Sequence, residues 1–240
     1  ALYTGASYQP LRLGGPRFSM EPALLEQLTN DGSSVIYLDR PHNPTGQVIP
    51  LETAEKMARE AMGKGIWIII DEAYGDFIPD EESAASIDLP NIVTCRSFSK
   101  GLGAAGLRVG YAVTRSPELA SAFRTLQPPF AVGTLDSLLA EAILRDESYL
   151  HETRKYVRTA KEKMIEALKS KKGFTVAETD LRVPIALLSQ EAGDLAARLA
   201  GAGISCEPGP GFFDLDERSV RLRVPSPAQL DEFLRRIDAL

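Results

Sequence analysis

Seven polar side chains stand in loops that directly follow apolar runs, where a mere scaffold would not need them. They supply an amide, a carboxylate, a phenol, two hydroxyls, an amine and a guanidinium, on Asn43, Asp71, Tyr74, Ser97, Ser99, Lys100 and Arg108. Titratable and hydrogen-bonding groups of this variety are typical of a catalytic or ligand-binding crevice. Whether they form one depends on the elements that position them.

Four apolar runs precede or border these loops and are predicted to be strands: residues 35–38, 66–70, 91–95 and 108–113. Between the first two, apolar residues recur at helical spacing, with Pro50 before them and Gly63 after. This order predicts a right-handed βαβ unit, with the second strand buried on both faces. We therefore predict an α/β fold with a doubly wound, mostly parallel sheet. The strand ends would meet at one edge, where such sheets bind ligands.

The second half of the chain predicts a smaller α+β domain. Residues 134–170 form a helical pattern that continues to a stop at Gly173. The shorter elements expected after it are a strand at 183–188, a helix at 193–199, a strand at 220–224 and a helix at 228–237. We place the domain boundary so that residues 1–145 form a partial large domain with its linking helix, and residues 146–240 form the small domain. Residues 8–13 resemble a strand and its exit.

Each candidate residue also has an ordinary structural explanation. Asp71 could cap a helix, and Lys100 could be a solvated loop lysine. Arg108 could pair with a surface carboxylate for little energy. These explanations are favoured for each residue alone, but the placement of all of them at one sheet edge favours a functional site.

Composition narrows the classes of protein. The 240 residues carry 27 basic and 33 acidic side chains, a net charge of −6, which offers no general attraction to nucleic acid or anionic lipid. No apolar run approaches the roughly 20 residues needed to span a bilayer, and no secretory signal is visible. Two cysteines and two distant histidines predict neither a disulfide framework nor a metal site. We expect a cytoplasmic protein without a metal, nucleic-acid or membrane partner.

Three motifs carry a family resemblance: Pro41-His42-Asn43-Pro44-Thr45-Gly46, Asp71-Glu72-Ala73-Tyr74 and Ser97-Phe98-Ser99-Lys100-Gly101, with Gly106-Leu107-Arg108 behind them. Asn43 precedes Asp71 by 28 residues, Asp71 precedes Lys100 by 29, and Lys100 precedes Arg108 by 8. These loops and intervals resemble those of class I/II aminotransferases, which are pyridoxal-phosphate enzymes of fold type I. The residues that follow Tyr74 (Gly-Asp-Phe) favour the histidinol-phosphate aminotransferase branch.

The resemblance implies pyridoxal 5′-phosphate as the cofactor and assigns catalytic roles to Lys100, Asp71 and Tyr74. Lys100 resembles the lysine that forms a Schiff base with the cofactor aldehyde and later moves the proton at the substrate α-carbon. Asp71 would keep the pyridine nitrogen protonated, so that the ring accepts electrons. Asn43 and Tyr74 would donate hydrogen bonds to the phenolate oxygen of the ring.

The same resemblance assigns the cofactor phosphate to Ser97, Ser99 and Arg108. Two further expectations concern glycines: Gly101 and Gly103 would let the backbone pass close to the cofactor.

Substrate binding is assigned to Arg221 and Asn43. The run Arg221-Leu222-Arg223-Val224 resembles the family strand whose arginine grips the substrate α-carboxylate, and the pattern selects Arg221 rather than Arg223. A bidentate guanidinium–carboxylate contact would fix the orientation of the substrate. The alternative is that both arginines face solvent on an edge strand.

The resemblance implies an aminotransferase that moves an amino group between an amino acid or histidinol phosphate and a 2-oxo acid, and that works as a homodimer. The alternatives are a lyase or decarboxylase of the same fold, as in the O-phosphothreonine type, or an inactive truncated relative. The sequence is shorter than the family pattern. We expect the part of that pattern which holds a phosphate-binding loop to be missing, and much of the cofactor affinity of this chain alone to be lost with it.

Overall fold

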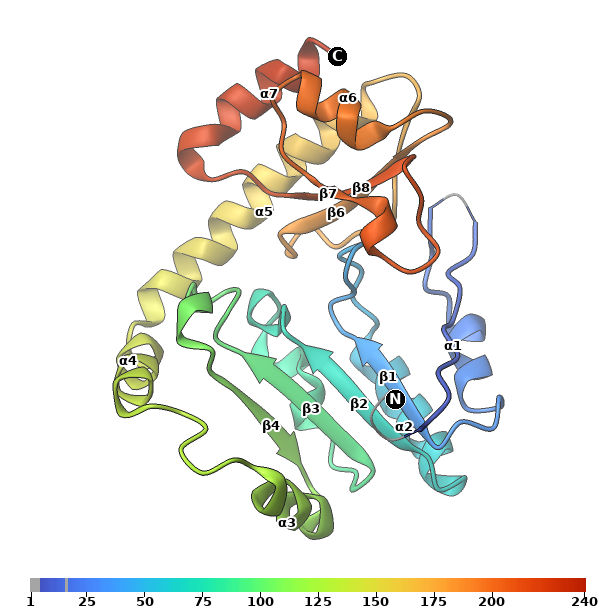
Figure 1. Cartoon of the computed structure of the whole chain (residues 1–240), viewed down its shortest axis with the longest axis vertical. Coiled ribbons are helices and arrows are strands. Elements are labelled where there is room, and N and C mark those ends of the chain that lie inside the picture. Colours follow the sequence, from blue (N-terminus) through green and yellow to red (C-terminus); the bar gives the residue numbers. More distant parts are fainter. Residues whose placement is uncertain (1–4, 16) are drawn as a thin grey trace.

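The computed structural model describes residues 5–15 and 17–240 of the chain. Its first sheet has the strand order β1-β2-β3-β4: β1 (Val35–Asp39), β2 (Trp67–Glu72), β3 (Ile92–Ser97) and β4 (Gly110–Thr114) (Figure 1). The first three strands are parallel, whereas β4 is antiparallel to β3. The carboxyl ends of β1, β2 and β3 and the amino end of β4 therefore lie at one edge.

The helices of this half are α1 (Pro22–Leu28), α2 (Leu51–Gly63), α3 (Pro117–Leu126) and α4 (Thr134–Arg145), with 3-10 turns at Gly75–Phe77, Asp80–Glu82, Ala84–Ser86 and Ala105–Leu107. Helix α2 begins after Pro50 and aligns its buried residues in one stripe, Ala54, Met57, Ala58 and Ala61. This stripe joins Ile68 and Ile70 of β2 in one apolar cluster, which confirms the expected βαβ unit.

The two faces of β2 are not equally buried, which corrects the expectation of a strand buried on both. Alternate residues of β2 are buried and half-buried, and on the neighbouring β1 Val35 is 51% and Tyr37 57% exposed. The physical reason is that α2 covers only the face that carries Ile68 and Ile70.

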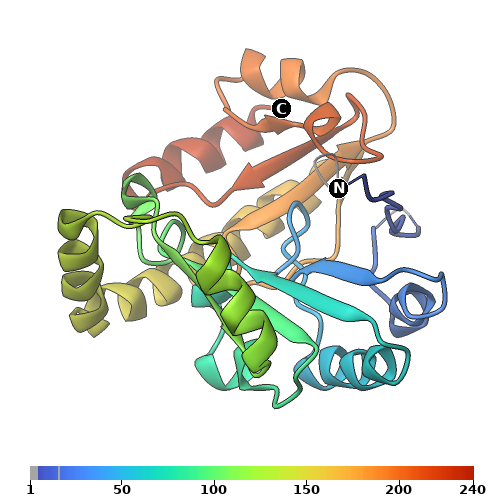
Figure 2. The same cartoon turned by 60° about the horizontal axis from the view of Figure 1, so that its bottom comes forward.

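The second half begins with a long helix and a second sheet. Its elements are α5 (Glu147–Lys169), β5 (Phe174–Val176), β6 (Ile185–Gln190), α6 (Leu195–Gly201), β7 (Glu207–Pro208), β8 (Ser219–Arg223) and α7 (Leu230–Asp238), with 3-10 turns at Gly209–Gly211 and Pro227–Gln229. The strands are antiparallel in the order β5-β6-β8-β7. Figures 1 and 2 show α5 running from the first sheet to the second.

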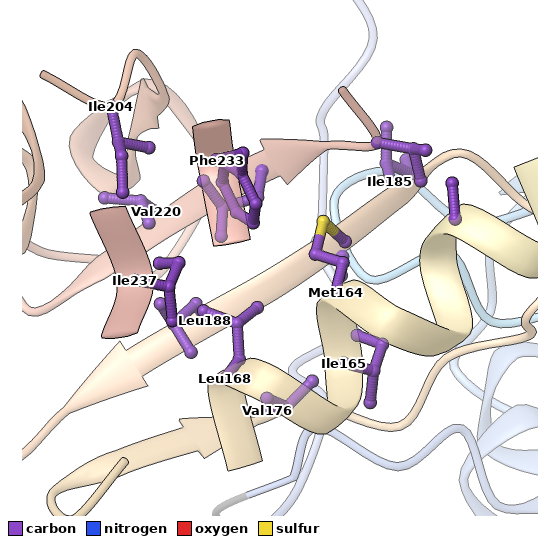
Figure 3. Close-up of a cluster of buried hydrophobic side chains, with 14 of the residues drawn as sticks. Met164, Ile165, Leu168, Val176, Ile185, Leu188, Ile204, Val220, Phe233 and Ile237 are labelled. Atoms are coloured by element: carbon purple, nitrogen blue, oxygen red, sulfur yellow. The ribbon is translucent and has the colours of Figure 1, made fainter. Parts of the chain in front are cut away.

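The second sheet has its own apolar core. Met164 and Leu168 of α5 pack with Leu188 of β6 and Ile237 of α7 (Figure 3). Each of the four is completely buried, and burying a side chain of this size contributes about 1.5–3 kcal/mol.

The structure corrects three sequence predictions. The helical pattern at 134–170 forms two helices, because the Asp146 carboxylate accepts a hydrogen bond from the Tyr149 amide and begins α5 there. The strand predicted from residue 108 begins at Gly110, because Arg108 adopts a left-handed backbone with φ 54°. Residues 8–13 form no strand. The prediction missed the short strands β5 and β7.

Among the residues that the structure describes, every helix is too short or too polar to cross a membrane.

Candidate active site

The sequence-predicted residues meet at the edge of the first sheet where β1, β2 and β3 end. Asn43 follows β1, Asp71 is the last residue but one of β2, and Lys100 follows β3. Arg108 reaches the same edge because β4 is antiparallel and begins there, with Gly110 paired to Ser97. Arg108 was expected at this edge of a parallel sheet. It does lie there, but because β4 runs antiparallel to β3.

Asp71 is held from two sides. Its Oδ2 accepts a hydrogen bond from the Tyr37 hydroxyl at 2.5 Å, and its Oδ1 accepts one from the Ala73 amide at 2.8 Å. Hydrogen bonds to both oxygens fix the plane of the carboxylate. Such a group can bind a cation placed beyond the strand end.

Lys100 lies against Tyr74. The Lys100 Nζ is 5.3 Å from the centroid of the Tyr74 ring, a contact that favours a cation over an aromatic face. Lys100 itself is exposed, whereas Tyr74 is only 9% exposed. Burial raises the pKa of the Tyr74 phenol, and the charges of Arg221 and Arg223 partly oppose that rise. Tyr74 is therefore a hydrogen-bond donor at neutral pH.

The hydroxyls and the guanidinium form the other side of the site. Ser97 Oγ donates to Ser99 Oγ at 2.8 Å and accepts from the Ser99 amide at 3.0 Å, which closes a tight turn before Lys100. Arg108 is exposed and donates to the Ala105 carbonyl at 2.9 Å. A non-glycine residue in the left-handed region costs about 1 kcal/mol or more, and here it turns the chain from the loop into β4.

The second sheet contributes Arg221 of β8. Its Nη1 donates to Asn43 Oδ1 at 2.9 Å, although the two residues are 178 positions apart. The guanidinium also lies 5.4 Å from the centroid of the Phe212 ring and 3.9 Å from a carboxylate oxygen of Glu207. Arg223 is exposed. The geometry thus brings Arg221, and not Arg223, to Asn43.

Sequence reasoning missed Tyr37 and Asp39. Tyr37 donates to Asp71, and Asp39 is the register partner of Asp71 on the neighbouring strand. Burial, and after it the charge of Asp71, raises the pKa of Asp39 to about 6. The sequence signal was an acidic residue directly after the apolar run of β1, which was interpreted only as a strand end.

A buried ion network behind the site was also missed. Arg40 and Glu72 are each 1% exposed, with Arg40 Nη1 3.1 Å from Glu72 Oε1. Beside them, Arg96 Nη2 lies 3.1 Å from Asp76 Oδ1. Burial raises the pKa of Asp76, and Arg96 opposes the rise. Glu72 and Asp76 lie in or next to a recognised motif, but Arg40 directly follows β1 and Arg96 lies on β3.

The glycines after Lys100 approach protein atoms. A Cβ added at Gly101 would lie 2.4 Å from the Cβ of Asp76, and one at Gly103 would lie 2.6 Å from the Tyr149 hydroxyl. Close approach was expected at both glycines, but with the cofactor as the neighbour. In the structure Gly101 allows the Lys100 loop to rest directly on Asp76.

In the part of the chain that the structure describes, no group of three or more His, Cys, Asp or Glu side chains could hold a metal ion.

Comparisons with known proteins agree with the motif resemblance. The family model described as aminotransferase class I and II matches residues 17–237. A histidinol-phosphate aminotransferase of Symbiobacterium thermophilum is 29% identical over 237 residues, which cover 98% of this chain and 64% of that protein. The chain spans 35% to 64% of the length of the curated relatives of this kind.

Two solved structures share the fold. The histidinol-phosphate aminotransferase from Clostridium acetobutylicum superposes with a TM-score of 0.84 at 21% identity, over 94% of this chain and 69% of that chain. The L-threonine-O-3-phosphate decarboxylase from Porphyromonas gingivalis gives 0.74 at 24% identity, over 85% and 64%. These likenesses confirm the predicted α/β fold, with a mixed sheet and flanking helices.

Proposed function

This chain belongs to the class I and II aminotransferase family, and we propose that its site binds pyridoxal 5′-phosphate in an enzyme that moves an amino group between an amino acid and a 2-oxo acid. One observation carries the proposal. The amine of Lys100, the carboxylate of Asp71 and the phenol of Tyr74 meet at one sheet edge, and Arg221 reaches that edge from the second sheet.

The groups present fit the cofactor. The phosphate ester of the cofactor needs donors that bind an anion, and its aldehyde needs an amine. Its phenolate needs neutral hydrogen-bond donors, and its basic ring nitrogen needs a carboxylate. Ser97, Ser99 and Arg108 would hold the phosphate, and Lys100 would hold the aldehyde. When bound, the cofactor supplies an electron sink for the substrate α-carbon.

The chain's own residues would tune and orient that chemistry. Asp71, fixed by two donors, would hold a proton on the ring nitrogen. Tyr74 keeps its proton because burial raises its pKa, so it would donate to the phenolate oxygen. Asn43 Oδ1 accepts a hydrogen bond from Arg221, so the amide hydrogens of Asn43 would donate to the same phenolate oxygen. Lys100 is the base that would move the proton at the α-carbon.

Arg221 would bind the carboxylate of the 2-oxo acid and of the amino acid formed from it, with Asn43 beside it, because histidinol phosphate carries a phosphate group and no α-carboxylate. Its contacts with Asn43, Phe212 and Glu207 hold the guanidinium in place, and its side chain is still 24% exposed. A planar fork of donors that is held but accessible suits a bidentate carboxylate contact.

For the amino donor we propose histidinol phosphate, which is supported by the name of the relative that covers most of this chain. A second candidate is decarboxylation of a phosphorylated amino acid, because a decarboxylase shares the fold. Supplying histidinol phosphate with 2-oxoglutarate should yield glutamate. Release of carbon dioxide from O-phosphothreonine without glutamate would instead favour the second candidate.

We also propose that residues 1–145 and 146–240 form separate domains, and that the protein is a cytoplasmic homodimer with small-molecule substrates. The break between α4 and α5 at Asp146 supports the boundary. Exposed apolar side chains on and before α4, with Phe130 98% and Leu135 75% exposed, support burial against a second copy. Sedimentation of the full protein tests the dimer.

The cofactor site is tested by trapping. Purified chain is mixed with pyridoxal phosphate, reduced with borohydride, digested and mapped by mass spectrometry. A single adduct at Lys100 is expected, absent from Lys100→Ala and retained in Lys56→Ala, which alters a lysine whose side chain is 65% exposed. Labelling scattered over surface lysines would contradict the proposed site.

A further inference from the structure

Tyr37, Asp39 and Asp71 lie together at the ends of β1 and β2. Asp39 and Asp71 are register partners in this parallel pair, so their backbones are about 4.8 Å apart. Tyr37 stands two residues before Asp39, and residues two apart on a strand face the same side of a sheet. The phenol and both carboxyl groups therefore share one face, and the charge of Asp39 acts on the nearby Tyr74.

The Tyr37 hydroxyl is bonded to Asp71. Its proton is donated to Asp71 Oδ2 at 2.5 Å, the length of a strong bond to an ionised acceptor. Burial and the neighbouring carboxylates raise the pKa of Tyr37, so the hydroxyl remains a donor throughout the neutral range. Without it, one oxygen of Asp71 would lose its fixed donor.

Asp39 adds a second acid to the same face. The charged and titratable groups around it are Tyr37 on its own strand, Asp71 on β2 and Tyr74 after β2. Burial and Asp71 raise its pKa to about 6. Its charge therefore changes at a pH where Asp71 is needed as a carboxylate.

We propose that Tyr37 is a positioning residue for Asp71, holding that carboxylate in the orientation that receives a protonated ring nitrogen, against the repulsion of Asp39. The inference rests on the proposed cofactor site and extends it to a residue outside the three motifs. Tyr37 itself need not touch the cofactor, because it acts through Asp71.

The first test needs no cofactor. In chain labelled with ¹³C at the aspartate carboxyl groups, the Asp71 resonance is assigned by NMR with Asp71→Asn. Tyr37→Phe removes one hydrogen bond to that carboxylate and should move the Asp71 carboxyl resonance. The matched control is Tyr111→Phe. Tyr111 lies on β4 of the same sheet, is 48% exposed, and has no hydroxyl hydrogen bond among the described residues.

An Asp71 carboxyl resonance at the same position in Tyr37→Phe and in wild type would overturn the inference, and so would an equal movement of that resonance in Tyr111→Phe. A measurement on wild-type chain alone guards against a variant that fails to fold. Replacing hydroxyl hydrogen with deuterium should shift the Asp71 carboxyl resonance if Tyr37 donates to it. No isotope shift would refute the bond.

The second test measures the dissociation constant of pyridoxal phosphate by absorbance. Tyr37→Phe should bind about tenfold more weakly than wild type, and Tyr111→Phe should bind equally well. Equal affinity in Tyr37→Phe would refute the positioning role while leaving the proposed function intact. If wild type does not bind the cofactor, the proposed function itself fails, and the role of Tyr37 toward the cofactor fails with it.

Discussion

Glu72→Gln should destabilise the protein by about 3 kcal/mol through the buried ion pair with Arg40. Both residues are 1% exposed. Glu72 Oε1 accepts from Arg40 at 3.1 Å and from the Ala84 amide at 2.7 Å, and Oε2 accepts from the Ser83 hydroxyl at 2.5 Å. Glutamine keeps Oε1 for the first two donors and can donate its amide to the hydroxyl. The change therefore removes the charge while the hydrogen bonds can be kept.

The expected loss of stability follows from the interactions that Arg40 keeps in Glu72→Gln. Arg40 donates from Nε to the Ile49 carbonyl at 2.7 Å, but its charge would stay buried without a carboxylate in contact with it. Breaking a buried pair from one side typically costs about 3–5 kcal/mol. We place the value at the low end because the hydrogen bonds survive. For comparison, Glu55→Gln breaks an exposed i,i+4 pair with Arg59, which is worth about 0.3–0.5 kcal/mol.

The assay is urea unfolding at pH 7 of wild type, Glu72→Gln, Glu55→Gln and the double variant Arg40→Met/Glu72→Gln. We expect the double variant to be more stable than Glu72→Gln, because it no longer buries the unpaired charge. If Glu72→Gln lost no more stability than Glu55→Gln, the ion pair would not contribute as reasoned. A double variant less stable than Glu72→Gln would show that the cost does not come from the unpaired guanidinium.

Three further predictions follow from the site. Gly101→Ala would force a Cβ against Asp76 behind the Lys100 loop. It should cost about 1–3 kcal/mol of folding stability and slow cofactor trapping. Gly106→Ala, where a Cβ meets no atom within 4 Å, should leave trapping unchanged. Arg221→Met should raise KM for a carboxylate-bearing amino donor about 100-fold in a transamination assay; an equal effect of Arg223→Met would reverse that assignment. Burial lowers the pKa of His42 from 6.5 to about 4. Between these two pH values the unfolded chain binds more protons than the folded chain, so about 3 kcal/mol of stability is lost as the pH falls from 6.5 to 4. The urea midpoint of His42→Gln should therefore depend less on pH in this range than that of wild type, and an equal dependence would contradict the reasoning.

The parts of the fold that could be predicted are those encoded by local patterns. The apolar run of β2 and the stripe of α2 specify a strand and an amphipathic helix without reference to distant residues. Strand direction is different, because an apolar run has the same period in either direction, so the antiparallel course of β4 could not be foreseen. The break at Asp146 rests on one capping side chain inside a continuous helical pattern.

The residues of the site also separate into those that local sequence patterns identify and those that they do not. The residues of the motif loops, such as Lys100 and Asp71, were identified from their spacing, and the structure places them together. Tyr37 and Arg40 were not, because each acts on a partner 32 or more positions away on another strand. Only the register of β1 against β2 shows that these pairs meet.

The hydrogen bond from Arg221 to Asn43 has a consequence for how a ligand enters. The bond holds the guanidinium aimed at the sheet edge before any carboxylate arrives, so little rotational freedom is lost on binding. A single hydrogen bond to a charged group contributes about 1.5–3 kcal/mol, and a carboxylate can offer two in its place. An incoming carboxylate can therefore replace the Asn43 side-chain amide as the partner of Arg221. The state of the released Asn43 amide would then show whether a ligand is bound to Arg221, 178 positions away in the chain.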